Sequence, residues 1–146
     1  MPAESHLALI ARTIQLSVAP VFLLTAIGTM LAVLTSRLNR IVDRARVLEE
    51  RMASLTTKEQ GEIHTELSTL SRRSKFINAA ITLGTICALL ICSMIAAMFV
   101  GVFLSINLTD VVVLLFVTAM LAFIGALVAF LREIFIAVKG LRIGMK

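Results

Sequence analysis

The chain has 146 residues, of which 59% are apolar and 16% are charged, and its formal net charge is +5. A soluble domain is typically about 45–50% apolar and about 25% charged. This composition excludes a disordered chain, a collagen and a disulfide scaffold, and it argues against a soluble enzyme. Three apolar blocks alternate with charged sequence, so we expect a single all-α membrane domain over residues 1–146.

The first apolar block, residues 18–36, is predicted to be span one, since a membrane-spanning helix needs about 20 mostly apolar residues. Ahead of it, residues 5–16 are predicted to form a separate interfacial helix, with Leu7, Ile10 and Ile14 on one face. Pro20 supports a break there, because proline suits the first turn of a helix. One continuous helix with a kink at Pro20 is the alternative.

Residues 37–75 are polar, but their apolar residues recur at intervals of three and four. This spacing is the seam of a coiled coil. It predicts a long antiparallel helical hairpin in which Met52 faces Ile63 and Leu48 faces Leu67. The seam consists of Leu38, Ile41, Ala45, Leu48 and Met52 on the first arm and Ile63, Leu67 and Leu70 on the second.

The turn of this hairpin is marked by a capping signal. Thr56 with Glu59 fits a capping box, and Thr57 with Gln60 fits one as well. We therefore expect the first arm to end near residue 55 and the second to begin near residue 58.

Two further spans are predicted, over residues 76–104 and 111–131, followed by a tail over residues 132–146. In the last span, Ala122 with Ala126 and Gly125 with Ala129 are pairs of small residues four apart. Small residues at this spacing let helices approach closely. We expect them to form a helix contact face.

The distribution of Lys and Arg predicts the orientation in the membrane. Nine of the 14 basic residues lie between spans one and two, four follow span three, and residues 105–110 contain none. Cytoplasmic loops carry an excess of Lys and Arg, so the hairpin and the C-terminus are expected in the cytoplasm and the N-terminus outside. Arg72, Arg73 and Lys75 are then expected at the lipid headgroups, as topological anchors or, alternatively, as ligands of anionic lipids.

Residues for catalysis or for holding a cofactor are not evident. His6 and His64 are expected on opposite sides of the membrane, and Cys87 and Cys92 lie five apart on one helix. The sequence has no glycine-rich phosphate loop, and it has neither Trp nor Tyr to accompany a basic nucleic-acid surface. We therefore expect no enzyme activity, no metal, no cofactor and no nucleic-acid partner.

Span one and the start of the hairpin carry a polar stripe at helical spacing. Its members are Thr25, Thr29, Ser36 and Asn39, with Ala32 among them and Arg40 next to its cytoplasmic end. Hydroxyl residues in a span support either helix packing or a hydrated pathway. The pore hypothesis places Thr25, Thr29, Ser36, Asn39 and Arg40 around the axis of a homo-oligomer of four to six subunits, acting as an ion channel. The alternative is a non-conducting scaffold whose hairpin docks a partner.

Two segments carry a resemblance to a known family. They are residues 14–24, IQLSVAPVFLL, and residues 33–46, VLTSRLNRIVDRAR. Together they resemble an uncharacterised family of small bacterial inner-membrane proteins, a domain of unknown function, over about residues 9–131 of the chain. The resemblance implies a bacterial inner-membrane location and supplies no catalytic residues.

Overall fold

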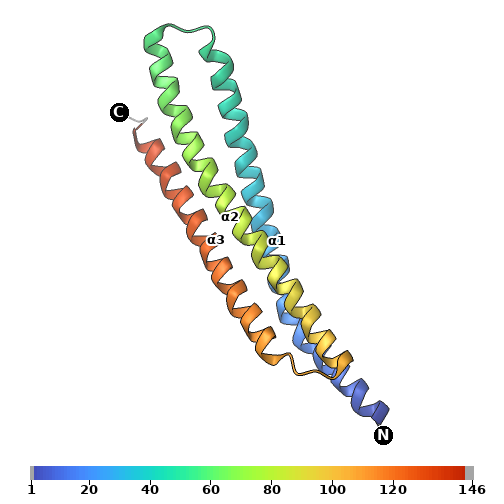
Figure 1. Ribbon diagram of the computed structural model, residues 1–146. Coiled ribbons are helices and arrows are strands. Elements are labelled where there is room, and N and C mark those ends of the chain that lie inside the picture. Colours follow the sequence, from blue (N-terminus) through green and yellow to red (C-terminus); the bar gives the residue numbers. More distant parts are fainter. Residues whose placement is uncertain (1, 144–146) are drawn as a thin grey trace. The chain divides into compact units, whose positions relative to one another are not determined.

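The computed structural model describes residues 2–143 of the chain. Their backbone forms three α-helices, α1 (Pro2–Met52), α2 (Thr57–Leu104) and α3 (Thr109–Ile143), shown in Figure 1. Each of the three is long and apolar enough to cross a membrane. The predicted all-α architecture with three candidate spans is therefore confirmed.

The chain divides into two compact units, and each draws on all three helices. The first unit comprises Met1–Met30 and Leu83–Ile124. Its core includes Ile27, Cys87, Ile91 and Ala119, whose side chains are almost wholly buried. Thr13 and Ser17 are also buried, and their hydroxyls donate to the carbonyls four residues earlier at 2.9 and 2.8 Å. This internal bonding satisfies the two polar side chains within α1.

The structure differs from the separate interfacial helix expected over residues 5–16, because α1 runs through Pro20 as one helix. A proline inside a helix costs about 3 kcal/mol, since it removes one backbone hydrogen bond and crowds the preceding turn. Ending the helix within an apolar span would leave several backbone groups unsatisfied, and each of these costs several kcal/mol in hydrocarbon. The continuous helix is the less costly arrangement.

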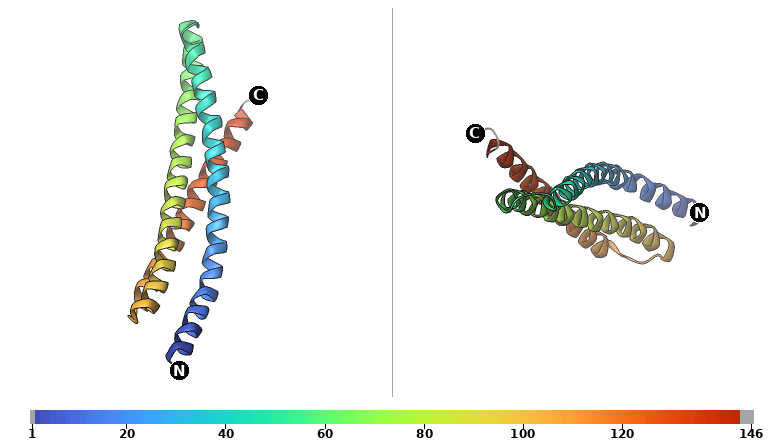
Figure 2. Two further views of the ribbon diagram at one scale, coloured as in Figure 1. Left: turned by 90° about the vertical axis from the view of Figure 1, so that its right-hand side faces the viewer. Right: turned by 90° about the horizontal axis from the view of Figure 1, so that it is seen from above.

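The second unit comprises Leu31–Thr82 and Gly125–Lys146. Within it, the end of α1 and the start of α2 lie side by side and are joined by residues 53–56 (Figures 1 and 2). An ion pair of 3.0 Å between Arg44 and Glu66 links the two arms. Every member of the predicted seam is buried or half-buried, with Ile41, Leu48 and Leu70 the most completely enclosed.

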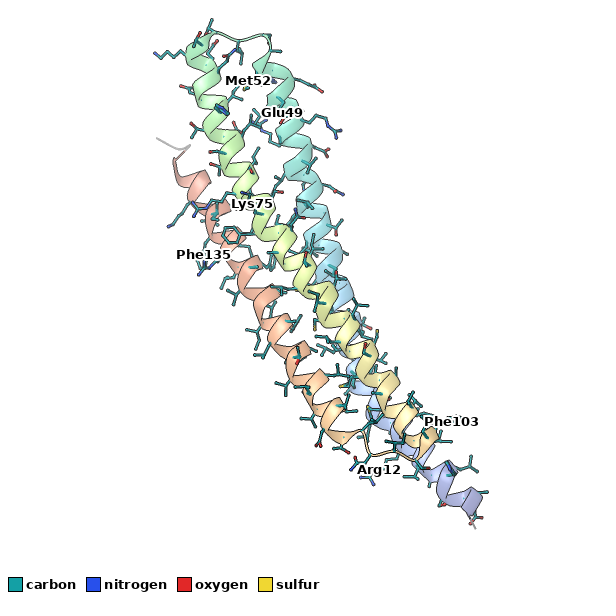
Figure 3. The ribbon with its side chains drawn as sticks, in the orientation of Figure 1. Arg12, Glu49, Met52, Lys75, Phe103 and Phe135 are labelled. Atoms are coloured by element: carbon teal, nitrogen blue, oxygen red, sulfur yellow. The ribbon has the colours of Figure 1, made fainter. Side chains whose placement is uncertain are left out.

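Hydrogen bonds from side chains cap both helix ends at the turn between the arms. Thr56 donates its backbone N–H and its hydroxyl to Oε2 of Glu59, at 3.2 and 2.6 Å, which is the capping box at the start of α2. These two bonds hold the pKa of Glu59 below its ordinary value, the hydroxyl having the larger effect. Gln60 donates through Nε2 to the carbonyls of Met52 and Leu55 at 3.2 and 3.1 Å. Because Gln60 caps Met52, labelled in Figure 3, α1 ends three residues earlier than expected.

Residues 105–108 connect α2 to α3 in the first unit. Ser105 adopts a left-handed backbone conformation with a φ of 54°, and the N–H of Ile106 donates to the carbonyl of Gly101 at 3.0 Å. The chain passes so close to Gly101 that a Cβ there would lie 3.2 Å from the Ile106 carbonyl oxygen. Oδ1 of Asn107 accepts from the N–H of Thr109 at 3.1 Å and supports the start of α3.

The predicted tail over residues 132–146 is helical as far as Ile143, and residues 144–146 lie outside the described part of the chain. Apolar residues continue beyond the predicted end of the span, through Phe135, Ile136 and Val138, without a proline or a turn signal. The helix therefore has no local reason to end at Leu131. Figure 3 labels Phe135, whose exposed ring lies on this added length of α3.

Candidate functional site

Glu133, on the added length of α3, is completely buried in the second unit. Its Oε2 accepts a hydrogen bond from Nη1 of Arg37 at 2.8 Å. Its Oε1 accepts from Nε and Nη2 of Arg73 at 3.1 and 2.8 Å. We call these three residues the charge triad. One carboxylate thus joins α1, α2 and α3.

The triad satisfies the physical requirements for a charge away from water. A buried carboxylate is very costly unless it is paired and hydrogen-bonded. Both oxygens of Glu133 are bonded, and the side chains of Arg37 and Arg73 remain 34% and 26% exposed. The guanidinium of Arg37 also lies 5.3 Å from the ring centroid of Phe130, within the range of a cation–π interaction. Two guanidinium groups against one carboxylate leave the triad positively charged.

A cavity of about 350 Å³ adjoins the triad in the second unit. Four arginines line it, Arg37, Arg40, Arg44 and Arg73, together with apolar side chains from each of the three helices. Arg44 is paired with Glu66 at the exposed surface. Arg40 is exposed and forms no ion pair with any residue among those the structure describes. The cavity is therefore electropositive.

The predicted pore-lining stripe is exposed along the whole of its length in a single chain. Thr25, Thr29, Ser36 and Asn39 have exposed side chains, as has Arg40. The hydroxyls of Thr25 and Thr29 donate to the carbonyls of Val21 and Thr25 at 3.3 and 3.0 Å. Their protons are satisfied within α1, so only the oxygen lone pairs are presented outward.

The three residues expected at the lipid headgroups differ in their exposure. Arg72 and Lys75 are exposed, whereas Arg73 is half-buried and bound to Glu133. Adjacent positions on a helix point in different directions, about 100° apart at 3.6 residues per turn. Arg73 therefore faces the interior of the second unit, and Arg72 faces outward.

The sequence prediction does not include Glu133 in the site, because it ends span three at Leu131 and treats residues 132–146 as a tail. A signal was present in the spacing of the small residues. Ala122, Ala126, Ala129 and Glu133 follow one another at intervals of four, three and four, so Glu133 lies on the contact face of α3. Ala126 is fully buried, as expected for that face. A carboxylate in register with a buried helix face points to a cationic partner, because a buried charge is costly unless it is paired.

Together, the all-helical fold and three helices that are each long and apolar enough to cross a membrane suggest a membrane protein. The family model described as protein of unknown function DUF2721 matches residues 17–143, and the chain belongs to this family. No match was found among curated proteins or among solved structures.

Proposed function

We propose that the chain assembles as a homo-oligomer that forms an ion-conducting pore, with α1 around the axis. The observation that carries this proposal is the exposed stripe of Thr25, Thr29 and Ser36 on a helix that can cross a membrane. The chain's own α2 and α3 leave the stripe uncovered. We propose that in a membrane this stripe is covered by the same stripe on other copies, or by water between them.

A closed ring is the usual symmetric arrangement of identical membrane subunits, and we propose four to six copies. Rings of hydroxyl oxygens can replace part of the hydration shell of an ion. The outward lone pairs of Thr25 and Thr29 suit this role, because their protons are already donated to the backbone. Asn39 and Arg40 then lie at one mouth of the pore.

We propose that this mouth is cytoplasmic and that the membrane is a bacterial inner membrane. The basic residues of the hairpin and of the C-terminal part of α3 support this orientation through the positive-inside rule. Arg72 and Lys75, both exposed, then lie near the headgroups. The N-terminus and residues 105–108 lie outside.

Electrical recording from the purified chain in planar bilayers tests the pore. We expect unitary currents, and we expect Thr29→Leu to reduce them, because a leucine replaces the hydroxyl oxygens with a bulky apolar ring. Thr118→Leu is the matched control, since Thr118 is also an exposed threonine whose hydroxyl donates to the carbonyl four residues earlier, at 2.7 Å. It lies on α3, outside the proposed axis, and its currents should equal those of the unaltered chain.

A second candidate, a non-conducting scaffold, is favoured by one observation. Val42 and Val47 on the first arm are 43% and 42% exposed in the single chain, which suits the docking of a partner. Correctly inserted chain that passes no current would contradict the pore and favour the scaffold. Equal loss of current in both threonine variants would contradict the placement of α1 around the axis. Cysteines at Val42 that cross-link copies of the chain to one another would instead favour a self-contained assembly.

A further inference from the structure

We propose that the cavity lined by Arg37, Arg40, Arg44 and Arg73 binds a phosphoryl group. The inference stands on the second unit of a single chain, and it requires neither a pore nor an oligomer. The ligand is identified by its chemistry, a tetrahedral anion with several oxygen acceptors. It is supplied either by the headgroup of an anionic lipid or by a soluble phosphate compound.

The charge balance around the cavity leaves room for an anion. Four guanidinium groups line it, and two carboxylates bond to them, Glu133 to Arg37 and Arg73 and Glu66 to Arg44. Two positive charges are therefore left over. Arginines gathered around one cavity repel one another, and a bound anion offsets that repulsion.

Donors remain available to bind such an anion. Arg37 uses only Nη1 for Glu133, so its Nε and Nη2 have no partner among the described residues. None of the guanidinium nitrogens of Arg40 has a partner among the described residues. Guanidinium groups present planar forks of N–H donors that match the oxygens of phosphate, often with two bonds from one arginine.

The charge triad preorganises two of the arginines that line the cavity. Glu133 is fully buried and holds Arg37 and Arg73 in place from behind, on two different helices. Side chains that are already ordered lose less conformational entropy on binding, which favours affinity. Ile41, Leu70 and Ala137 provide apolar walls, and charge interactions are stronger beside such walls than in open water.

The place of the cavity along the sequence suits a phosphoryl group at a membrane surface. Arg37 follows the apolar segment of α1, Arg73 precedes that of α2, and Glu133 lies near the C-terminal end of that of α3. In a bilayer this is the level of the headgroups, where phosphodiesters are abundant. A soluble phosphate compound reaches the same level from the aqueous side.

Native mass spectrometry and calorimetry on the full chain in a neutral detergent test the proposal with two probes. The first is dioleoylphosphatidylglycerol, compared with phosphatidylcholine, whose choline neutralises the phosphate. The second is inorganic pyrophosphate. Preferential binding of the anionic lipid identifies a headgroup site, whereas binding of pyrophosphate alone identifies a site for soluble phosphates.

Arg40→Ala is the informative variant, because Arg40 lines the cavity without an ion pair and its loss strands no buried charge. Arg46→Ala is the matched control, since Arg46 is an exposed arginine of the same helix that does not line this cavity. We expect Arg40→Ala to weaken binding about tenfold, as for the loss of one charge-assisted interaction, and Arg46→Ala to change it less than about twofold. Arg40→Lys should restore part of the affinity.

Two results would overturn the proposal. One is that neither probe binds more tightly than phosphatidylcholine. The other is that Arg40→Ala and Arg46→Ala weaken binding equally, which indicates attraction to the overall charge of the chain. Circular dichroism on each variant establishes that it has kept its helical content before its binding is compared.

Discussion

Oε2 of Glu133 lies 2.8 Å from Nη1 of Arg37, although the two residues are 96 positions apart in the chain. The other oxygen of the same carboxylate binds Arg73, 60 positions away. The three helices of the second unit therefore meet at one side chain. We therefore expect its removal to affect more of the fold than the loss of a surface ion pair does.

We predict that Glu133→Gln destabilises the second unit by about 3 kcal/mol. This value is the lower end of the range for breaking a buried ion pair, since water still reaches both arginines. Helicity monitored during detergent-induced unfolding measures the loss. Glu66→Gln is the matched control, because Glu66 pairs with Arg44 at the exposed surface, and we expect it to cost less than about 1 kcal/mol. Equal losses for the two variants would show that the buried position confers no advantage.

The capping box predicts a titration that can be followed directly. Hydrogen bonds from Thr56 lower the pKa of Glu59, so Thr56→Ala should raise it toward the ordinary carboxyl value. Because the folded-state pKa lies below the unfolded value, the stabilisation is present above the unfolded pKa and is lost as pH falls through the folded pKa. Carbon-detected NMR of the Glu59 carboxyl measures the change. Thr57→Ala is the control, and an equal rise in that variant would rule out the Thr56 bonds as the cause.

Gly101 and Gly61 should respond differently to alanine. A Cβ at Gly61 meets nothing within 4 Å, whereas one at Gly101 lies 3.2 Å from the Ile106 carbonyl oxygen. Alanine favours a helix over glycine by about 1 kcal/mol, so Gly61→Ala should raise stability by up to that amount. Gly101→Ala should not raise stability in this way, because the carbonyl oxygen of Ile106 must move to make room for the Cβ. Unfolding midpoints of the two variants decide the matter, and equal increases would contradict the close approach at residues 105–108.

The proposed orientation predicts which end of the chain can be labelled from outside the cell. In a background with Cys87 and Cys92 replaced by serine, single cysteines at Ser5 and at Lys146 are treated with an impermeant maleimide. We expect labelling at Ser5 in intact spheroplasts and labelling at Lys146 only after permeabilisation. Both should react equally in detergent. The opposite pattern in intact spheroplasts would invert the orientation.

The spans and the seam can be predicted from the sequence, because both follow from local periodicity. Residues 18–36, 76–104 and 111–131 are apolar over enough length to cross a membrane, and each falls inside one of the helices. The ends of the helices were harder to place. Pro20 signals a break that the apolar surroundings prevent, and Gln60 ends α1 early through a contact from the following helix.

The charge triad could not be derived from local sequence, since it depends on three residues that only the fold brings together. Arg37 and Arg73 are indistinguishable in type from their exposed neighbours Arg40 and Arg72. Their roles follow from which side of each helix faces Glu133. That relationship depends on the packing of α3, which no single segment encodes.

Because Glu133 lies near the end of the chain, it is synthesised after both of the arginines that it binds. Arg37 and Arg73 leave the ribosome first, and the carboxylate they share follows Arg73 by 60 residues. At about 5–20 residues per second the interval lasts about 3–12 s. During that time the first two helices carry two cations at the future meeting point without the shared counter-ion. The last helix to be translated therefore supplies the counter-ion that the two helices made before it share.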